Sequence, residues 1–427
     1  MTESKRGRVT IQDSNGDVFD NWSTFSMTET YDDPLGSYEF TIRPLRKDVR
    51  EVQARFQKGE LVSIKIDDNP RATPSIITVK TSLSKGGGVE MTVSCKTVLH
   101  VATQASADPE AFDKAPADVP VDEIVIRTLS PFGFTHIGTD FKRHTEVVLG
   151  KAVAGDSATV SLLDLKAKEL KVNENEGAYQ YCSRIFSRLG YALRVDESGI
   201  LILGSPNYFQ EPSYSLVEDY VGTRVGARAG DKALSLELSE TNDQQFSKVV
   251  VRGKSEEKRK KKATTKPQAA TRLSRLTGRF ANAEMAEAAQ GTYDIYSAKQ
   301  PFGEAVEELI DPRQPYYTST IQPFKPKYIN DRYSRDNDKC NGFCILVHAK
   351  PSVNAFVVTA TVDGIVSHST GAIWAIDTIC SVFSDTLLIE DDMWVYEVSM
   401  KVAKKGGART TLKLLPVGSL VIGDVPG

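Results

Sequence analysis

Two stretches near the C-terminal end carry the pattern from which the expected architecture follows: VNAFVVTATVDG at residues 353–364 and MWVYEVSMKVAKKGGARTTLKLLP at residues 393–416. In both, apolar and polar residues alternate, and this period of two predicts half-buried β-strands. The Lys405-Gly406-Gly407 segment predicts a hairpin turn, and Pro416 marks a strand end because proline cannot donate to a ladder. A lone hairpin is marginal in water, so further strands must come from elsewhere in the chain.

The alternation also assigns faces to the strand predicted at residues 394–402. Trp394, Tyr396 and Val398, continued by Met400, should form its buried face. The opposite face carries the polar residues Glu397, Ser399 and Lys401. We therefore expect Trp394, Tyr396 and Val398 in the core.

The N-terminal segment, residues 1–96, repeats this kind of pattern. Three groups of alternating apolar residues predict three strands: Tyr38, Phe40 and Ile42; Val62, Ile64 and Ile66; Val89, Met91, Val93 and Cys95. Phe40 and Val93 are expected core residues of a first small barrel. Its last hairpin also contains Lys-Gly-Gly, at residues 85–87, which indicates either an internal duplication or the coincidence of two glycine-rich turns.

Helical spacing appears only in the middle of the chain, in residues 97–212. Residues 121–129 and 177–189 are predicted helices, and residues 191–195 with 200–203 form a predicted hairpin. An α/β domain is expected here. The segments 213–253 and 353–427 are then expected to form a second, split barrel, interrupted by an inserted peripheral domain at 254–352. That insertion opens with the basic run Lys258 to Lys262, a solvated loop or a contact for an acidic neighbour or DNA.

Composition limits the possible classes of protein. A chain of 427 residues allows two to four domains at about 150 residues each. It lacks an apolar run of about 18 residues and an apolar leader behind Met1, so neither a membrane span nor a secretory signal is expected. The net charge of −3 gives no overall sign of nucleic-acid binding. The five scattered cysteines indicate reduced thiols.

Few sequence motifs point to a catalytic or metal-binding site. Cys340, Cys344 and His348 have a spacing of four that would suit a zinc ion on one helix face, but the apolar surroundings favour buried, metal-free side chains. Adjacent carboxylates in a strand point to opposite faces, so they do not form the acid pair of a glycosidase. These pairs are Asp32-Asp33, Asp67-Asp68 and Asp391-Asp392. We expect no catalytic residue, no cofactor and no resident metal.

The C-terminal pattern resembles a known family. Residues 372–374 (AIW), 393–398 (MWVYEV) and 406–414 (GGARTTLKL) are similar to the last barrel strands of the baseplate hub proteins of contractile-tailed phages, the Mu-like and late control protein D group with the T4-like tail hub fold. Residues 33–40 and 246–253 add weaker matches in the family's order. The resemblance implies an α+β, mainly β fold: two related tail-tube-like barrels, an intervening α/β domain and an insertion in the second barrel.

The same resemblance implies a structural role. Such hubs are homotrimers that adapt the hexameric tail tube to the trimeric central spike, contact other baseplate proteins of the wedge or tape-measure type, and let DNA pass through the lumen. The expected location is the virion tail, assembled in the host cytoplasm. Two alternatives stay open at this point: a tail-associated peptidoglycan hydrolase and a secretion-system spike subunit.

Overall fold

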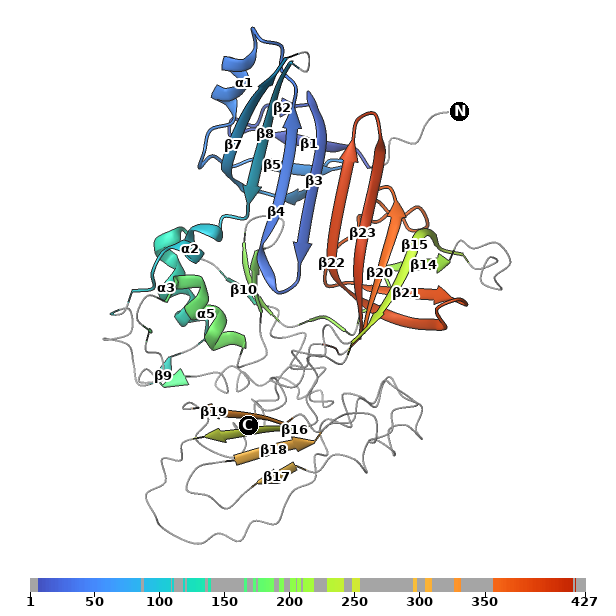
Figure 1. The fold of residues 1–427 in the computed structure, drawn as a ribbon. Coiled ribbons are helices and arrows are strands. Elements are labelled where there is room, and N and C mark those ends of the chain that lie inside the picture. Colours follow the sequence, from blue (N-terminus) through green and yellow to red (C-terminus); the bar gives the residue numbers. More distant parts are fainter. Residues whose placement is uncertain are drawn as a thin grey trace.

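Figure 1 shows the protein as a computed structural model. The structure describes residues 7–85, 88–108, 110, 118–119, 121–134, 137–139, 165–166, 172–173, 176–187, 192–195, 200–204, 206–208, 210–218, 229–241, 248–253, 295–297, 304–308, 326–331, 356–417 and 419. The described part is mainly β, as the sequence predicts; the helices within residues 100–187 gather in one region, and a short helix at residues 49–55 lies apart from them (Figure 1).

The N-terminal β domain consists of two four-stranded layers and one short helix. One layer has the order β2-β1-β5-β6, and the strands β3-β4-β8-β7 form the other. Their bounds are β1 Val9–Gln12, β2 Val18–Phe19, β3 Trp22–Thr30, β4 Asp33–Ile42, α1 Val49–Arg55, β5 Ser63–Ile66, β6 Asn69–Ala72, β7 Ser75–Ser84 and β8 Gly88–Lys96. The predicted face of Tyr38, Phe40 and Ile42 is confirmed, since all three are buried on β4.

Six strands from the second half of the chain close into a barrel. The pairing runs β21-β14-β15-β20-β23-β22 and returns from β22 to β21. Their bounds are β14 Tyr214–Glu218, β15 Asp231–Glu240, β20 Phe356–Asp363, β21 Ile379–Ser384, β22 Ile389–Ala403 and β23 Gly407–Pro416. The predicted Lys-Gly-Gly turn joins β22 to β23, with Gly407 at a φ of 80°. Closure leaves no free edge within the barrel.

Strand β22 belongs to the barrel and to the N-terminal domain at once. Residues 389–394 pair with β21, and residues 397–403 pair with β3 on the same edge of β22. Its other edge pairs with β23 over residues 393–403. The N-terminal layer and the barrel therefore share one ten-stranded sheet, and a single hydrophobic core runs through both.

A β-bulge lies where β22 changes partner. Val395 is opposite Leu414 and Glu397 is opposite Lys413, so Tyr396 is the additional residue between these two pairs. Because an additional residue interrupts the period of two, the side chains before and after the bulge exchange faces.

Because of the bulge, the side chains of β22 do not share faces as the sequence predicts. Val398 and Met400 lie in the main core, whereas Trp394 and Tyr396 lie in a separate cluster on the other side of the sheet. The expectation that all four share one face is therefore wrong, although all four are buried. Tyr31 covers the outer cluster, with ring centroids 4.8 Å from Trp394.

The described part of residues 97–212 contains three α-helices and several short strands. Helices α2, α3 and α5 gather beside the three-stranded sheet β10-β13-β12 around their own core (Figure 1). The bounds are α2 His100–Gln104, β9 Asp118–Val119, α3 Val121–Leu129, β10 Ile137–Thr139, β11 Leu165–Lys166, α5 Ala178–Ser187, β12 Ala192–Val195 and β13 Leu201–Gly204. The two predicted helices and the predicted hairpin are confirmed.

One predicted barrel strand belongs elsewhere. Residues 248–253 form β16, which pairs with strands of the insertion and not with the barrel. The sheet has the order β17-β18-β16-β19, with β16 Lys248–Gly253, β17 Ile295–Ser297, β18 Glu304–Glu308 and β19 Pro326–Asp331. The physical reason is that β15 already pairs with β20 along its length and closes the barrel without these residues. The basic run Lys258 to Lys262 lies outside the described residues.

Trp394 and Lys401 give a direct test of this strand. Trp394→Ala should lower the free energy of unfolding by about 3–5 kcal/mol, because Trp394 is completely buried and its truncation leaves a cavity. Lys401→Ala, on an exposed position of the same strand, should change it by less than about 0.5 kcal/mol. Urea unfolding of both variants measures this difference, and equal effects would contradict the assigned burial.

Candidate functional site at the domain junction

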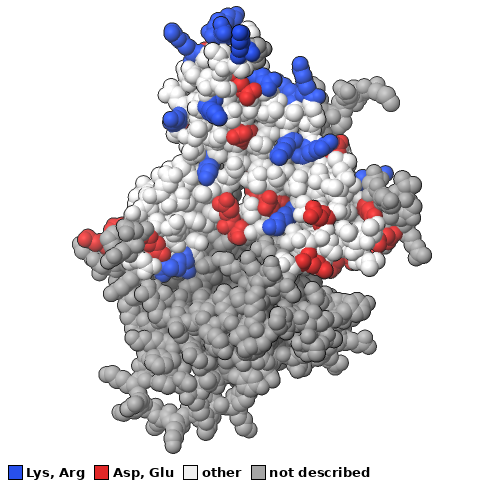
Figure 2. All heavy atoms as spheres, viewed as in Figure 1, with Lys and Arg blue, Asp and Glu red and all other residues white. Residues whose placement is uncertain are grey.

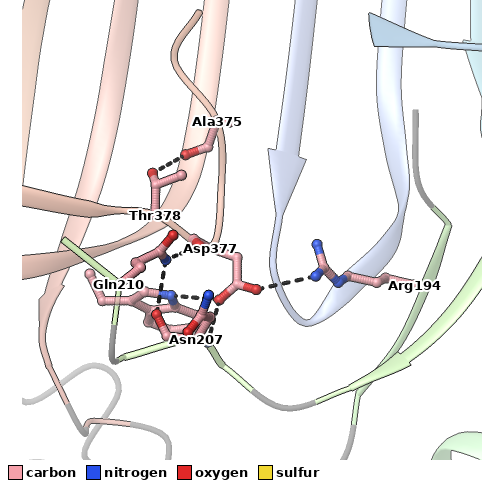
Figure 3. Close-up of polar contacts among 7 residues, drawn as sticks. Arg194, Asn207, Gln210, Ala375, Asp377 and Thr378 are labelled. Atoms are coloured by element: carbon pink, nitrogen blue, oxygen red, sulfur yellow. Dashed lines mark hydrogen bonds and ion pairs between the residues drawn. The ribbon is translucent and has the colours of Figure 1, made fainter. Parts of the chain in front are cut away.

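Asp377 joins the α/β region to the barrel (Figure 3). It lies in the connection between β20 and β21 at a φ of 60°, a left-handed conformation that aspartate tolerates better than most residues. Its Oδ1 accepts hydrogen bonds from Trp394 Nε1 at 3.0 Å and from the Asn207 amide at 2.9 Å. Its Oδ2 accepts from Arg194 Nη2 of β12 at 3.2 Å.

The backbone of Asp377 is held as firmly as its side chain. Its N–H donates to the carbonyl of Val395, the residue just before the bulge, at 2.9 Å. Its carbonyl accepts from Gln210 Nε2, in the segment that leads into β14 (Figure 3). One aspartate therefore connects β12, the start of the barrel and β22, and it is only 9% exposed.

A second buried ion pair lies on the neighbouring side of the junction. Arg71 of β6 pairs with Glu29 of β3, and Tyr38 Oη donates to Glu29 Oε1 at 2.8 Å. Burial, together with the adjacent Glu29 charge, raises the pKa of Tyr38 well above its usual value, so the phenol stays a proton donor. The arrangement ties the two layers of the N-terminal domain together.

These groups line a small cleft between the three units. Its volume is about 130 Å³, well below the roughly 300 Å³ at which small-molecule pockets begin. Its walls come from both β domains and the α/β region and include Glu29, Asp33, Arg71, Arg194 and Ala375. Because its charged groups are hydrogen-bonded or ion-paired to each other and to the backbone, the arrangement is that of a structural joint.

The three carboxylate pairs are used in local structure. Asp67 and Asp68 have φ values of 49° and 66° in a turn, and Asp67 accepts the amide protons of Gly7 and Arg8. The other pairs lie elsewhere: Asp32 accepts a hydrogen bond from Tyr396, Asp33 accepts from the Leu35 amide, and Asp391 and Asp392 are adjacent on β22. Glu29 and Asp33 line the same cleft, but Glu29 is held by Arg71 and Tyr38.

Cys340, Cys344 and His348 lie outside the described residues. Within the described part, no group of three metal-ligating side chains occurs. Three cysteines are described and all are buried: Cys95, Cys182 and Cys380. Burial raises the pKa of Cys95 and of Cys182 to about 12, which keeps both thiols protonated and poor nucleophiles near neutral pH.

The expected core residues lie in two different cores. Phe40, Val93 and Val398 are fully buried in the main core, and Trp394 and Tyr396 are buried in the outer cluster. Sequence patterns did not point to Asp377 or Arg194, because a single polar residue in a connection or in a hairpin strand carries no signal of its own. Asp377 could have been suspected only from its place between Ala-Ile and Thr-Ile in an otherwise apolar segment.

Comparison with solved structures defines the fold. The chain is similar to a tail protein from Neisseria meningitidis MC58, with a TM-score of 0.66 at 15% identity over 97% of this chain and 98% of that one. It is also similar to the 43 kDa tail protein of prophage MuSo2 from Shewanella oneidensis, with a TM-score of 0.64 at 11% identity over 97% and 99%. Neither the protein-family models nor the curated proteins gave a match.

The class that follows is one of fold: the chain has the fold of these two tail proteins along nearly its whole length. In particular, the expected mainly β tail-protein fold is confirmed. None of the described helices is long and apolar enough to cross a membrane.

Substitution of Asp377 tests the joint. Asp377→Ala removes the acceptor for three donors and places alanine at a positive φ, so it should lower the free energy of unfolding by about 3–5 kcal/mol. Asp377→Asn is the matched control, since asparagine tolerates this φ and keeps one oxygen, and it should cost about half as much or less. Urea unfolding measures both, and an alanine variant as stable as the wild type would contradict the proposed joint.

Proposed function

We propose that the protein is the structural hub of a phage tail baseplate. In this role it is a homotrimer that adapts the hexameric tail tube to the trimeric central spike. The observation that supports this most is the ten-stranded sheet shared by the N-terminal β domain and the barrel through β22. Two β units fixed side by side in one chain are what a threefold ring needs to present six similar lobes.

Symmetry explains why such a subunit is useful. A ring of three identical chains has only threefold symmetry, whereas a tail tube of six identical subunits offers a sixfold face. Three chains with two β units each give quasi-sixfold contacts above and threefold contacts below. The N-terminal residues 1–96 supply one unit, and the split barrel within 213–253 and 353–427 supplies the other, without β16.

The DNA relationship proposed is passage through the lumen of this ring. The net charge of −3 suits such a role, because each basic contact to a phosphate would add salt-dependent affinity and slow a moving polyanion. Further partners would be the tail tube protein, the central spike and other baseplate proteins of the wedge or tape-measure type. The location proposed is the virion tail, after assembly in the host cytoplasm.

The proposal includes that the protein is not an enzyme. Among the described carboxylates, Asp67 and Asp33 are engaged in turns and Glu29 is engaged in an ion pair. A secretion-system spike subunit remains the nearer alternative, because such a protein would also need paired β units. What separates it from a hub is the partner: a hub must bind a tail tube end.

Mass measurement with the tail tube protein tests the proposal. The purified protein, alone or with a tail tube protein, should form particles containing three copies of the 46.9 kDa chain. Native mass spectrometry gives the copy number, and electron microscopy gives the symmetry of the complex. A protein that stays monomeric or dimeric in both conditions would contradict the hub assignment.

A further inference from the structure

The tip of the N-terminal domain carries a basic surface. We define this basic tip by four exposed cations: Arg46, Lys47 and Arg50, in α1 and the segment before it, and Lys85 in the turn after β7. Gln53 of α1 donates to Thr81 of β7 at 3.2 Å, which fixes the two elements side by side. Two acidic residues, Asp48 and Glu51, lie on the same helix turn, so the surface keeps a positive balance.

The basic tip also exposes apolar side chains. Leu45 and Leu83 are each 65% exposed, one next to Arg46 and the other two residues from Lys85. Figure 2 shows Lys and Arg gathered at this end of the molecule and Asp and Glu gathered towards the barrel. On the face shown in Figure 2, charge is therefore unevenly distributed, and the two exposed leucines lie close in sequence to the cations of its positive end. Such a surface suits an acidic partner that also offers an apolar side chain.

The turn between β21 and β22 combines acidic groups with an exposed apolar side chain. Leu388 is 90% exposed and has a φ of 54°, which leucine rarely adopts. Asp385 in the turn and Glu390 and Asp392 on β22 are exposed around it. We call these four residues the acidic turn.

The acidic turn is held in place from outside its own hairpin. Glu218 at the end of β14 accepts hydrogen bonds from Ser384 Oγ at 2.8 Å and from the Thr386 amide at 3.0 Å, and also from the Thr386 hydroxyl. The hydrogen bonds from Thr386 and Ser384 lower the pKa of Glu218, so it remains a charged acceptor at neutral pH. The exposed Leu388 is therefore presented by a fixed backbone.

We propose that the acidic turn of one protomer docks on the basic tip of the next protomer. Leu388 would pack beside Leu45 and Leu83, and the carboxylates would meet the exposed cations. The two surfaces lie at opposite ends of the β body: α1 is at one end and the β21–β22 hairpin is at the other (Figure 1). A contact between two different surfaces of identical chains is heterologous and can close into a ring. This inference rests on the proposed trimeric hub and names the contact that closes it.

Leu388→Gly separates assembly from folding. Glycine relieves the positive φ, so the variant should be at least as stable as the wild type, yet it loses the apolar side chain of the contact. Trimer dissociation, measured by native mass spectrometry across a dilution series, should occur at concentrations at least tenfold higher than for the wild type. The matched control is Leu234→Ser, a leucine 56% exposed on the barrel, which should assemble like the wild type.

Charge reversal tests the pairing itself. Glu390→Lys with Asp392→Lys should weaken the trimer at least tenfold, and so should Arg46→Glu with Lys47→Glu. The chain with all four changes should regain most of the association, because each of the three contacts in the ring is again between opposite charges. A trimer unaffected by Leu388→Gly, or a chain with all four changes that associates no better than the two-residue variants, would overturn the proposed contact without contradicting the hub. A wild-type chain that never trimerises, even with the tail tube protein, would instead overturn the hub.

Discussion

The bulge at Tyr396 is the constraint on which the remaining architecture depends. Before it, β22 pairs with β21 and closes the barrel; after it, the same edge of β22 pairs with β3 of the N-terminal domain. A strand without the additional residue would keep its period of two and turn Val398 and Met400 out of the main core. With the bulge, β22 pairs with strands of both β units, and its side chains fill both the main core and the outer cluster.

The junction with the α/β region follows from the same bulge. Because the faces are exchanged, Trp394 points out of the barrel, where its indole N–H donates to Asp377 and its ring contacts Tyr31 and Tyr208. Asp377 in turn accepts from Arg194 of β12. A buried carboxylate is costly unless its partners are complete, and here they come from separate units of the chain. The joint is therefore stable only when all units are in position.

Much of this fold could be predicted from periodicity. The alternation at Phe40 and Val93 gives the correct buried faces, and helical spacing gives α3 and α5 in nearly their observed bounds. The faces of Trp394 and Val398 could not be predicted, because nothing in the local sequence marks Tyr396 as an additional residue. The position of the additional residue is decided by the pairing of β22 with strands that are far away in the sequence. The same limit applies to β16, whose continuous Val249-Val250-Val251 run fits either sheet.

The junction residues were beyond prediction for another reason. Asp377, Arg194 and the pair Arg71 and Glu29 come from segments far apart in the chain, and each looks like an ordinary surface residue by itself. Only the packed structure shows that they are buried together. Asp377 and Arg194 join the barrel to the α/β region, and Arg71 with Glu29 joins the two layers of the N-terminal domain.

Amide hydrogen exchange of the intact protein tests most directly whether the two β units form one body. The amides of β3 that pair with β22, within residues 24–30, should open with the same high free energy as those of β22 and β23. Exchange under native conditions at several denaturant concentrations, read by mass spectrometry of peptides, gives these values. We predict that β3, β22 and β23 open together as one cooperative unit. Opening of β3 at a free energy several kcal/mol below that of the barrel would contradict it.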